Sequence, residues 1–502
     1  MVNVVEAPSS PPSCMTNGSR ANADTTRSPN GTHRTSPQSS DKGPKNSAVG
    51  RIATYRHVVA IHSQVRHSCL SRDSTTTPSF IGFRNLTVVV LVAMNLRLVI
   101  ENFLKYGVLI CIKCHDYRKQ DVVIGAIFFG LVPCQLLCSY FIELAASRHA
   151  VRVIGRAKKT DKVLNESKRL WFVIALLHSI ISFFGLAVTS YAIYYYVNHP
   201  GIGTLCQIQV IIVSLKSYSY ALTNRDLRRA MLGSPSTDFE IPELYKSCPY
   251  PRNITLGNLA YFLLAPTLVY QPVYPRTPRV RWSFVGKRMF EFVCLAVVIW
   301  LLSAQYAAPL LRNATEKIAV LHFGSILERG LKLSTISLVI WLAGFYALFQ
   351  SLLNGLAEIM RFGDREFYTD WWNSPSFGVY WRSWNRPVYT FMKRHVYMPL
   401  VTRGWSSTAA GTVVFAVSAV LHEVLVGVPT HNLIGVAFMA MLFQLPLILL
   451  TAPFEKFKSP LGKAIGNSLF WVTFCVLGQP LGTLLYFFAW QAKYGSVSRA
   501  QS

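Results

Sequence analysis

The chain has 502 residues, of which 51% are hydrophobic and only 15% are charged. Apolar runs recur from about residue 85 to 490, which is typical of a multi-spanning α-helical membrane protein and not of a soluble multidomain enzyme. The formal net charge is +27. The bases lie in the N-terminal tail and between the apolar runs, where the positive-inside rule and anionic headgroups account for them, so we expect no nucleic-acid partner.

Residues 1–80 are rich in Ser, Thr, Asn, Pro and basic residues. Their apolar content is too low to bury a core, so the sequence predicts a disordered basic tail in the cytosol. Residues 81–490 are predicted to form one membrane domain, and residues 491–502 a short tail on the lumenal side.

The fold class expected is all-α, a polytopic membrane bundle of about nine transmembrane helices. The apolar runs that predict these helices are 86–112, 121–145, 170–196, 202–223, 289–310, 330–360, 408–428, 433–452 and 465–490. A further apolar stretch, 256–274, is broken by Pro266 and Pro272 and is predicted to be interfacial or re-entrant.

The distribution of bases predicts the orientation of these helices. A cytosolic N-terminus places the basic loops 146–169, 224–285 and 361–405 on the cytosolic side. The glycosylation sequon at Asn313 then falls in the lumen. A non-enzyme alternative is a membrane transporter, but the sequence has neither inverted repeats nor charges spread through several spans.

One predicted span, 408–428, contains Ser418, His422 and Glu423. A charged residue inside the bilayer costs roughly 2.5–3.5 kcal/mol on insertion scales, so such a group is a candidate functional site. A buried neutral imidazole is a suitable general base near pH 7. The alternative is that His422 only hydrogen-bonds another helix. Glu423 is rotated by about 100° from His422, so it either sets the local electrostatics or binds a neighbouring helix.

The segment 367–399 alternates aromatic and basic residues. It fits two functions equally well from composition alone. The first is an interfacial aromatic belt with headgroup-binding bases. The second is a platform for a phosphorylated ligand, because arginines grip phosphate and aromatic faces stack on a purine.

Several motifs resemble one known family. The run Phe367-Tyr368-Thr369-Asp370-Trp371-Trp372-Asn373 resembles the F-Y-x-D-W-W-N signature of the sterol and diacylglycerol acyltransferase branch of the membrane-bound O-acyltransferases. Ser418-x-x-x-His422-Glu423 resembles the helix that carries that family's catalytic histidine. Segments 380–388, 394–399 and 274–279 are more similar to the diacylglycerol enzymes than to the sterol enzymes. Tyr389 departs from the pattern, which often has His there.

The resemblance implies a reaction and an internal reaction chamber. Acyl would pass directly from acyl-CoA to the hydroxyl of diacylglycerol in the endoplasmic reticulum membrane, with sterol as the alternative acceptor. Acyl-CoA is a substrate, so no cofactor is expected. The haem-like Cys111-x-x-Cys114-His115 is attributed to chance. A homodimer or homotetramer is expected.

The resemblance also implies roles for single residues. His422 would be the general base, with Asn373 in an oxyanion-type role and Glu423 acting electrostatically. Asp370 would hold the loop. The substrate-binding residues expected are Trp372, Gln479, Gln444, Tyr389, Arg394 and Ser418.

Overall fold

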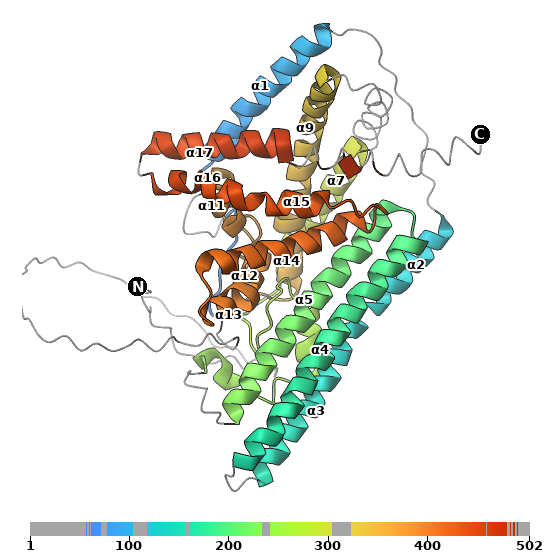
Figure 1. The fold of residues 1–502 in the computed structure, drawn as a ribbon, viewed down its shortest axis with the longest axis vertical. Coiled ribbons are helices and arrows are strands. Elements are labelled where there is room, and N and C mark those ends of the chain that lie inside the picture. The colour runs from blue at the N-terminus through green and yellow to red at the C-terminus, as the bar shows by residue number, and fades with distance from the viewer. Residues whose placement is uncertain are drawn as a thin grey trace, which may run out of the picture.

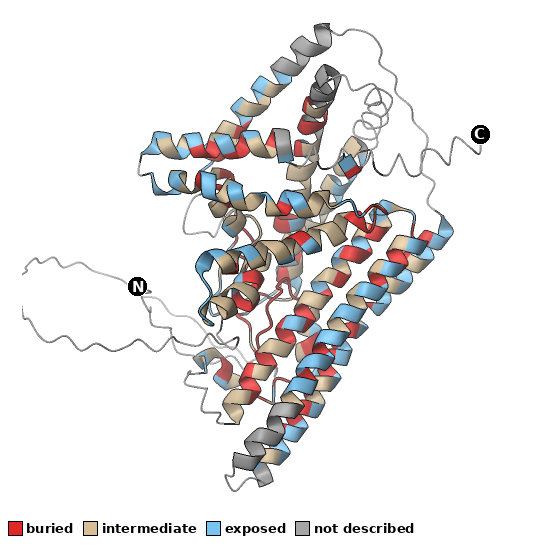
Figure 2. Cartoon of the chain, viewed as in Figure 1, coloured by how far each residue is buried: buried red, intermediate tan, exposed pale blue. Residues whose placement is uncertain are grey.

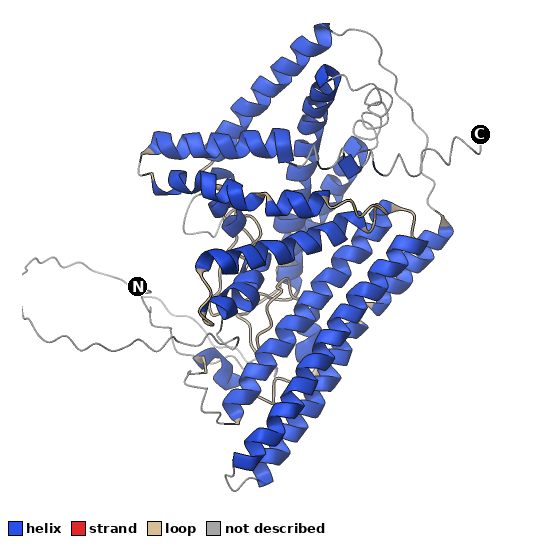
Figure 3. Cartoon of the chain, in the orientation of Figure 1, coloured by secondary structure: helices blue, strands red, loops and turns tan. Residues whose placement is uncertain are grey.

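The fold is all-α, as the sequence predicts, in a computed structural model that describes residues 57, 60, 62–71, 78–103, 118–156, 161–232, 241–303, 323–457 and 459–478, and four isolated positions up to 489. Within these ranges the chain forms helices joined by loops, with two isolated β-bridges and no strand (Figure 3). For several helix ends, including 95–103 and 323–329, only the backbone is described.

The helices fall into long membrane-type helices and short connecting ones. In chain order they are α1 (Ile81–Phe103), α2 (Lys119–Leu131), α3 (Cys134–Arg156), α4 (Asp161–Tyr196), α5 (Pro200–Met231), α6 (Leu256–Leu264), α7 (Trp282–Leu302), α9 (Phe323–Phe345), α10 (Leu353–Ile359), α11 (Phe377–Ser383), α12 (Arg386–Met392), α13 (Met398–Val401), α14 (Ser407–Gly427), α15 (Val436–Leu442), α16 (Gln444–Lys456) and α17 (Pro460–Val472). The described residues also form short 3₁₀ turns, η1 (Glu243–Ser247) and η4 (Trp371–Asn373), and π-helical turns, η3 (Tyr346–Leu352), η5 (Lys393–Tyr397) and η6 (Thr473–Gly478).

Two groups of helices make up most of the molecule. The long helices α3, α4 and α5 pack side by side, and α14, α15, α16 and α17 form a second stack beside them, with α7 and α9 behind (Figure 1). Phe172, Phe183 and Phe184 on α4 are between 65 and 73% exposed, and Figure 2 shows α4 as a largely exposed helix. Such a face suits contact with lipid, since a soluble protein rarely exposes so large an apolar surface.

Six stretches of the described residues are long and apolar enough to cross a membrane. They are Lys119–Ile154, Leu170–Tyr196, Pro200–Met231, Ser337–Ile359, Ser407–Gly427 and Val436–Lys456. Together they identify a multi-pass membrane protein, while the predicted count of nine spans is neither reached nor refuted by the described residues.

Two of the predicted spans are interrupted, and in both cases proline explains the break. The second span divides into α2 and α3 at Pro133, and the eighth divides into α15 and α16 at Phe443, three residues before Pro446. Proline has no backbone N–H to donate and its ring clashes with the preceding turn.

The stretch after residue 256 does not span the membrane. Helix α6 has nine residues and is therefore about 14 Å long, against about 30 Å of hydrocarbon. Lys216 of α5 closes its C-terminal end, because its ammonium group donates to the carbonyl oxygens of Phe262, Leu263 and Ala265, each at 2.8 Å. All three ammonium hydrogens are thus used where the helix dipole is negative.

The core is aromatic between α9, η4 and α17. Trp371 and Trp372 of η4 and Trp471 of α17 are at most 1% exposed. The ring of Trp371 lies 5.2 Å from Trp341 of α9 and 5.7 Å from Trp471. These edge-to-face and tilted pairs tie α9, η4 and α17 together.

The predicted disorder of residues 1–80 is wrong for part of that range. The described part of residues 57–71, here called the strap, packs into the protein. Arg66 N–H donates to Gly363 O at 3.0 Å, and Arg365 N–H donates back to Arg66 O at 2.9 Å. Ser68 Oγ donates to Gln350 Oε1 at 3.1 Å. The strap is held by these polar partners about 300 positions away and by the packing of Ala60, Cys69 and Leu70 against the core, and composition cannot reveal such distant partners.

Candidate active site

His422 lies in the last two turns of α14, in an apolar helix. Its Nδ1 is 2.8 Å from the carbonyl oxygen of Ser418, and the Ser418 hydroxyl is 3.3 Å from the same nitrogen. A carbonyl oxygen can only accept, so Nδ1 carries the proton and Nε2 keeps its lone pair. Among the described residues none hydrogen-bonds to Nε2. The imidazole is therefore held in the tautomer that presents a proton acceptor.

The surroundings of His422 connect the membrane helix to the basic segment. Leu421 and Val414 of α14 pack against a cluster that includes Phe391 and Met392 of α12. Ala419, one turn before His422, is fully buried, whereas His422 itself is half-buried. The histidine thus sits at the edge of a packed interface, where a substrate could reach it.

Glu423 binds a neighbouring helix. Its Oε1 accepts the N–H of Gly435 at 2.8 Å, and its Oε2 accepts the N–H of Phe438 at 3.1 Å and the hydroxyl of Tyr486 at 2.6 Å. A carboxylate is favoured at the N-terminus of α15, because unpaired backbone N–H groups and the positive end of the helix dipole meet there. Both oxygens are occupied by α15 and Tyr486, so the Glu423 carboxylate fixes the end of α14.

The loop of residues 361–373, here called the signature loop, is held by its surroundings. Trp372 is 1% exposed, donates from Nε1 to Ser79 O at 2.8 Å, and stacks on Phe83 of α1 with ring centroids 4.9 Å apart. The carbonyl oxygen of Trp372 accepts from Asn467 and Trp471 of α17. Trp372 is therefore part of the core, with no face open to a ligand.

Asn373 also binds the chain just before α1. Its Oδ1 accepts the N–H of Gly82, and its amide nitrogen donates to Ser79 O and, at 3.3 Å, to Asp370 Oδ2. A Cβ at position 82 would come within 1.7 Å of the Trp372 carbonyl oxygen, so only glycine permits this approach. Asp370 is exposed and braces the loop through Asn373.

Gln444 begins α16 and reaches toward α14 through an aromatic pair. Its Oε1 accepts the indole N–H of Trp381 at 3.3 Å, and the Trp381 ring lies 5.9 Å from Phe415 of α14. Phe415 is seven residues, or two helical turns, before His422, so both lie on one side of α14. Gln444 and His422 are thus brought to the same side of the stack.

Tyr389 and Arg394 are placed differently within the basic segment. The ring of Tyr389 is half-buried and lies about equally far from the guanidinium of Arg386 (6.0 Å) and the ammonium of Lys393 (5.9 Å). Arg394 points inward and is 1% exposed. Its guanidinium lies beside the buried Tyr245. Burial raises the pKa of the Tyr245 hydroxyl, and the positive charge of Arg394 partly opposes that rise. Tyr389 and the bases around it are the accessible part of this segment.

A buried histidine pair was not anticipated from the sequence. His57 of the strap stacks on His395, with ring centroids 5.0 Å apart and 3.1 Å between the Nδ1 atoms. Ser219 Oγ, which accepts the N–H of Tyr270 at 2.8 Å, bonds His395 Nε2 at 2.8 Å. Burial lowers the pKa of His57 to about 3 and that of His395 well below its usual value. Both rings are therefore neutral at pH 7. The residues next to His57 in the sequence form no pattern from which this pair could have been predicted.

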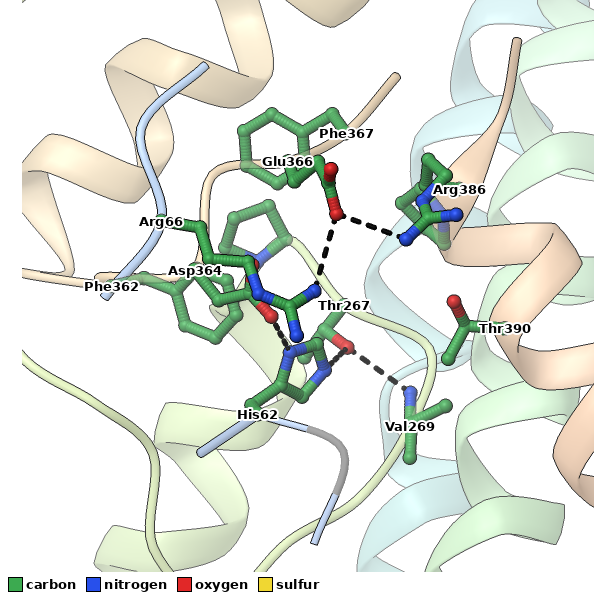
Figure 4. Close-up of a pocket in the computed structure, with 12 residues that line it drawn as sticks. His62, Arg66, Thr267, Val269, Phe362, Asp364, Glu366, Phe367, Arg386 and Thr390 are labelled. Carbon is green, nitrogen blue, oxygen red and sulfur yellow. Dashed lines mark hydrogen bonds and ion pairs between the residues drawn. The ribbon is translucent and has the colours of Figure 1, made fainter. Parts of the chain in front are cut away.

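A separate cavity lies between the strap, the loop after α6 and the signature loop (Figure 4). Figure 4 shows Glu366 bonded by Arg66 at 3.2 Å and by Arg386 at 2.9 Å. His62 lies in the same cavity, bonded to Asp364 and Thr267. His422 is not among the residues that line it.

Other predicted features cannot be placed. Gln479, the Cys111–His115 run and the Asn313 sequon lie outside the described residues. Eight of the nine predicted site residues lie within the described residues. Trp372 and Arg394 are buried at 1% exposure, which does not fit direct contact with a substrate, and the catalytic and binding roles of the others stay predictions.

Residues 256–487 match the profile of the membrane-bound O-acyltransferase family. The chain is 38% identical to diacylglycerol O-acyltransferase 1C of Glycine max, over 88% of this chain and 81% of that protein. It is 34% identical to diacylglycerol O-acyltransferase 1 of Arabidopsis thaliana, over 89% of this chain and 80% of that protein.

A more distant organism gives the same result. Diacylglycerol O-acyltransferase 1 of Dictyostelium discoideum is 34% identical over 84% of this chain and 64% of that protein. These matches extend well beyond the signature loop and α14, across most of the membrane domain. The chain belongs to the membrane-bound O-acyltransferase family, in the branch of the type 1 diacylglycerol acyltransferases.

Proposed function

We propose that this protein transfers a fatty acyl group from acyl-CoA to the free hydroxyl of diacylglycerol, yielding triacylglycerol and CoA. The relatives' activity supports the reaction. The observation that carries the mechanism is the His422 tautomer: Nδ1–H is anchored on Ser418 O, and Nε2 remains a proton acceptor inside a membrane helix.

His422 Nε2 takes the proton of the diacylglycerol hydroxyl as that oxygen attacks the thioester carbonyl. The imidazolium then returns the proton to the departing CoA thiolate, so the transfer is direct and has no net proton requirement. Diacylglycerol reaches this position from the bilayer, because α14 is itself a candidate span.

The CoA head group is assigned to the accessible part of the basic segment. Tyr389, flanked by Arg386 and Lys393, offers an aromatic face between two cations. Such a site suits a purine with phosphates. Phe391 and Met392 pack against Leu421 and so join this segment to α14. One acyl-CoA molecule can therefore bind with its nucleotide at the basic segment and its thioester beside His422.

The roles of the other predicted residues follow from their contacts. Glu423 positions α14 against α15, and Gln444 lines the chamber beside Phe415. Trp372 and Asn373 support the acyl-CoA site by holding the signature loop on α1. Gln479 is retained as a chamber residue on the family resemblance.

The proposed setting is the endoplasmic reticulum membrane, with the N-terminus in the cytosol and the chain in a homodimer or homotetramer. The family resemblance and the basic loops support this setting.

The test is expression in a cell that lacks neutral-lipid synthesis, followed by lipid analysis and an assay of its membranes with labelled oleoyl-CoA. We expect label in triacylglycerol. Label in sterol ester and none in triacylglycerol would contradict the proposal in favour of the sterol alternative.

A further inference from the structure

Three polar side chains at the cavity of Figure 4 are hydrogen-bonded in series. Thr267 Oγ lies 2.9 Å from His62 Nε2, and His62 Nδ1 bonds the carboxylate of Asp364. They come from the strap, the loop after α6 and the signature loop. His62, Thr267 and Asp364 are 9, 5 and 7% exposed, so the series is almost completely withdrawn from solvent.

The positions of the protons follow from the partners. A neutral His62 that donates its Nδ1–H to Asp364 keeps a lone pair on Nε2, which accepts the Thr267 hydroxyl hydrogen, while Thr267 Oγ accepts the N–H of Val269 at 3.2 Å. The ionised Asp364 then accepts the Nδ1–H of a neutral His62. This order of hydroxyl, imidazole and carboxylate is that of a hydrolytic triad, in which the imidazole removes the hydroxyl proton and the carboxylate holds the imidazole's tautomer.

The cavity adds charge and an apolar lining to this series. Arg66 and Arg386 both line it, and each uses only part of its donors on Glu366. Glu366 and Asp364 balance the two positive charges, and the guanidinium hydrogens that Glu366 leaves unused are the donors that an oxyanion in the cavity could accept from. Phe362 and Phe367 are among its apolar lining residues, and the small size of the cavity suits a short acyl chain.

We propose that Thr267 is an acyl acceptor in its own right and takes a short acyl group from a CoA thioester. The choice of donor rests on the proposed function. Thr267 Oγ attacks the thioester carbonyl carbon while its proton passes to His62 Nε2. The C–S bond breaks, and the imidazolium protonates the CoA thiolate. The products are an O-acylthreonine and CoA, and water can later hydrolyse the ester to release the acid.

The test uses the full-length chain in lipid nanodiscs with labelled acetyl-CoA and no diacylglycerol. Peptide mass spectrometry measures acetyl on the peptide that contains residue 267, and a thiol assay measures released CoA. We expect acetylation or CoA release with wild type and with Thr267→Ser, which keeps the hydroxyl. Thr267→Val removes both signals. Asp364→Asn, which favours the wrong tautomer, lowers the rate at least about 100-fold.

Matched controls separate this site from the proposed active site. Thr390→Val changes another hydroxyl in the same cavity and leaves acetylation unchanged. His422→Ala lowers triacylglycerol synthesis at least about 100-fold and retains acetylation. Thr267→Val loses acetylation and retains triacylglycerol synthesis, which also demonstrates that Thr267→Val folds. If Thr267→Val does not accumulate, the contrast between Thr267→Ser and Asp364→Asn decides.

Two results would overturn the inference: wild type that makes triacylglycerol yet neither carries acetyl nor releases CoA, or signals that persist in Thr267→Val. Acetylated wild type that makes no triacylglycerol would overturn the proposed function alone.

Discussion

The α14 helix around His422 and the polar junction made by the strap and the signature loop use polar groups in opposite ways. At the junction most polar groups are bonded: Asn373 and Trp372 each bind partners about 290 positions away in the sequence. In α14, one imidazole nitrogen is fixed by its own helix and the other is left available. The signature loop, which is the more recognisable motif in the sequence, thus supports the fold. Helix α14, which has few polar residues, provides the reactive imidazole.

Physical chemistry explains this division. A buried polar group without a partner costs about 1–3 kcal/mol, so a loop with many of them folds only if most are satisfied. A general base must keep a lone pair for the substrate. A histidine whose other nitrogen is anchored by a carbonyl one turn away meets that requirement with a single local bond.

The replacement His422→Ala should lower kcat for triacylglycerol synthesis about 100- to 10,000-fold, because it removes the general base. The measurement is acyl transfer in membranes containing equal amounts of wild-type and variant protein. Thermal stability should change little, since no described residue depends on Nε2. Intact acyl transfer in well-expressed His422→Ala would show that α14 serves only as scaffold.

Glu358→Gln should affect stability, in contrast to His422→Ala. It should lower the free energy of unfolding by about 3–5 kcal/mol, as expected when one member of a buried ion pair is removed. Glu358 is buried and binds Arg281 Nε at 3.1 Å and Arg365 Nη1 at 2.6 Å, which ties the start of α7 to the signature loop. The readout is the unfolding temperature in detergent.

The matched control for Glu358 is Glu455→Gln, which breaks the exposed pair with Arg382, whose side chains are 42 and 45% exposed. Its effect should stay within about 1 kcal/mol. Equal losses in both variants would mean that the junction is no more tightly held than the surface.

The strap should detach as the pH falls. Burial holds His57 neutral, with its pKa lowered from about 6.5 to about 3. The detached strap binds a proton below pH 6.5, whereas the docked strap does not. Docking is therefore fully stabilised above pH 6.5 and loses about 1.4 kcal/mol per pH unit below it, until the pH nears 3. His395 shifts in the same direction.

Hydrogen exchange of strap amides between pH 7.5 and 5, corrected for intrinsic rates, measures this effect. His57→Phe keeps an aromatic ring on His395 and should flatten the dependence. A strap equally protected at both pH values in wild type would rule out the histidine pair as its pH-sensitive contact.

Ser418→Ala should have the smallest effect. The backbone carbonyl of residue 418 holds His422 Nδ1 at 2.8 Å, and the hydroxyl, at 3.3 Å, is a second partner. A single neutral hydrogen bond contributes about 0.5–1.5 kcal/mol, so kcat should fall at most about tenfold. A loss as large as that of His422→Ala would place the Ser418 hydroxyl in the reaction itself.

Much of the molecule was predictable because the responsible forces are local. An apolar run long enough for the bilayer forms a helix wherever it occurs, so the sequence predicted α14 within about a residue, the spans of α4 and α5, and the non-spanning stretch at α6. Ser418 and His422 are four residues apart, and helix geometry alone brings them together.

Tertiary structure alone decided the rest. Whether Trp372 meets a ligand or the core depends on α1 and α17, which arrive from both ends of the chain. Glu423 met α15 through two N–H groups that no spacing rule identifies. Order in the strap depends on partners such as Asp364, 302 positions from His62. Hydropathy and periodicity show which side of a segment faces lipid, water or the core. The hydrogen-bond partner of a buried polar group instead depends on which distant segment of the chain packs beside it.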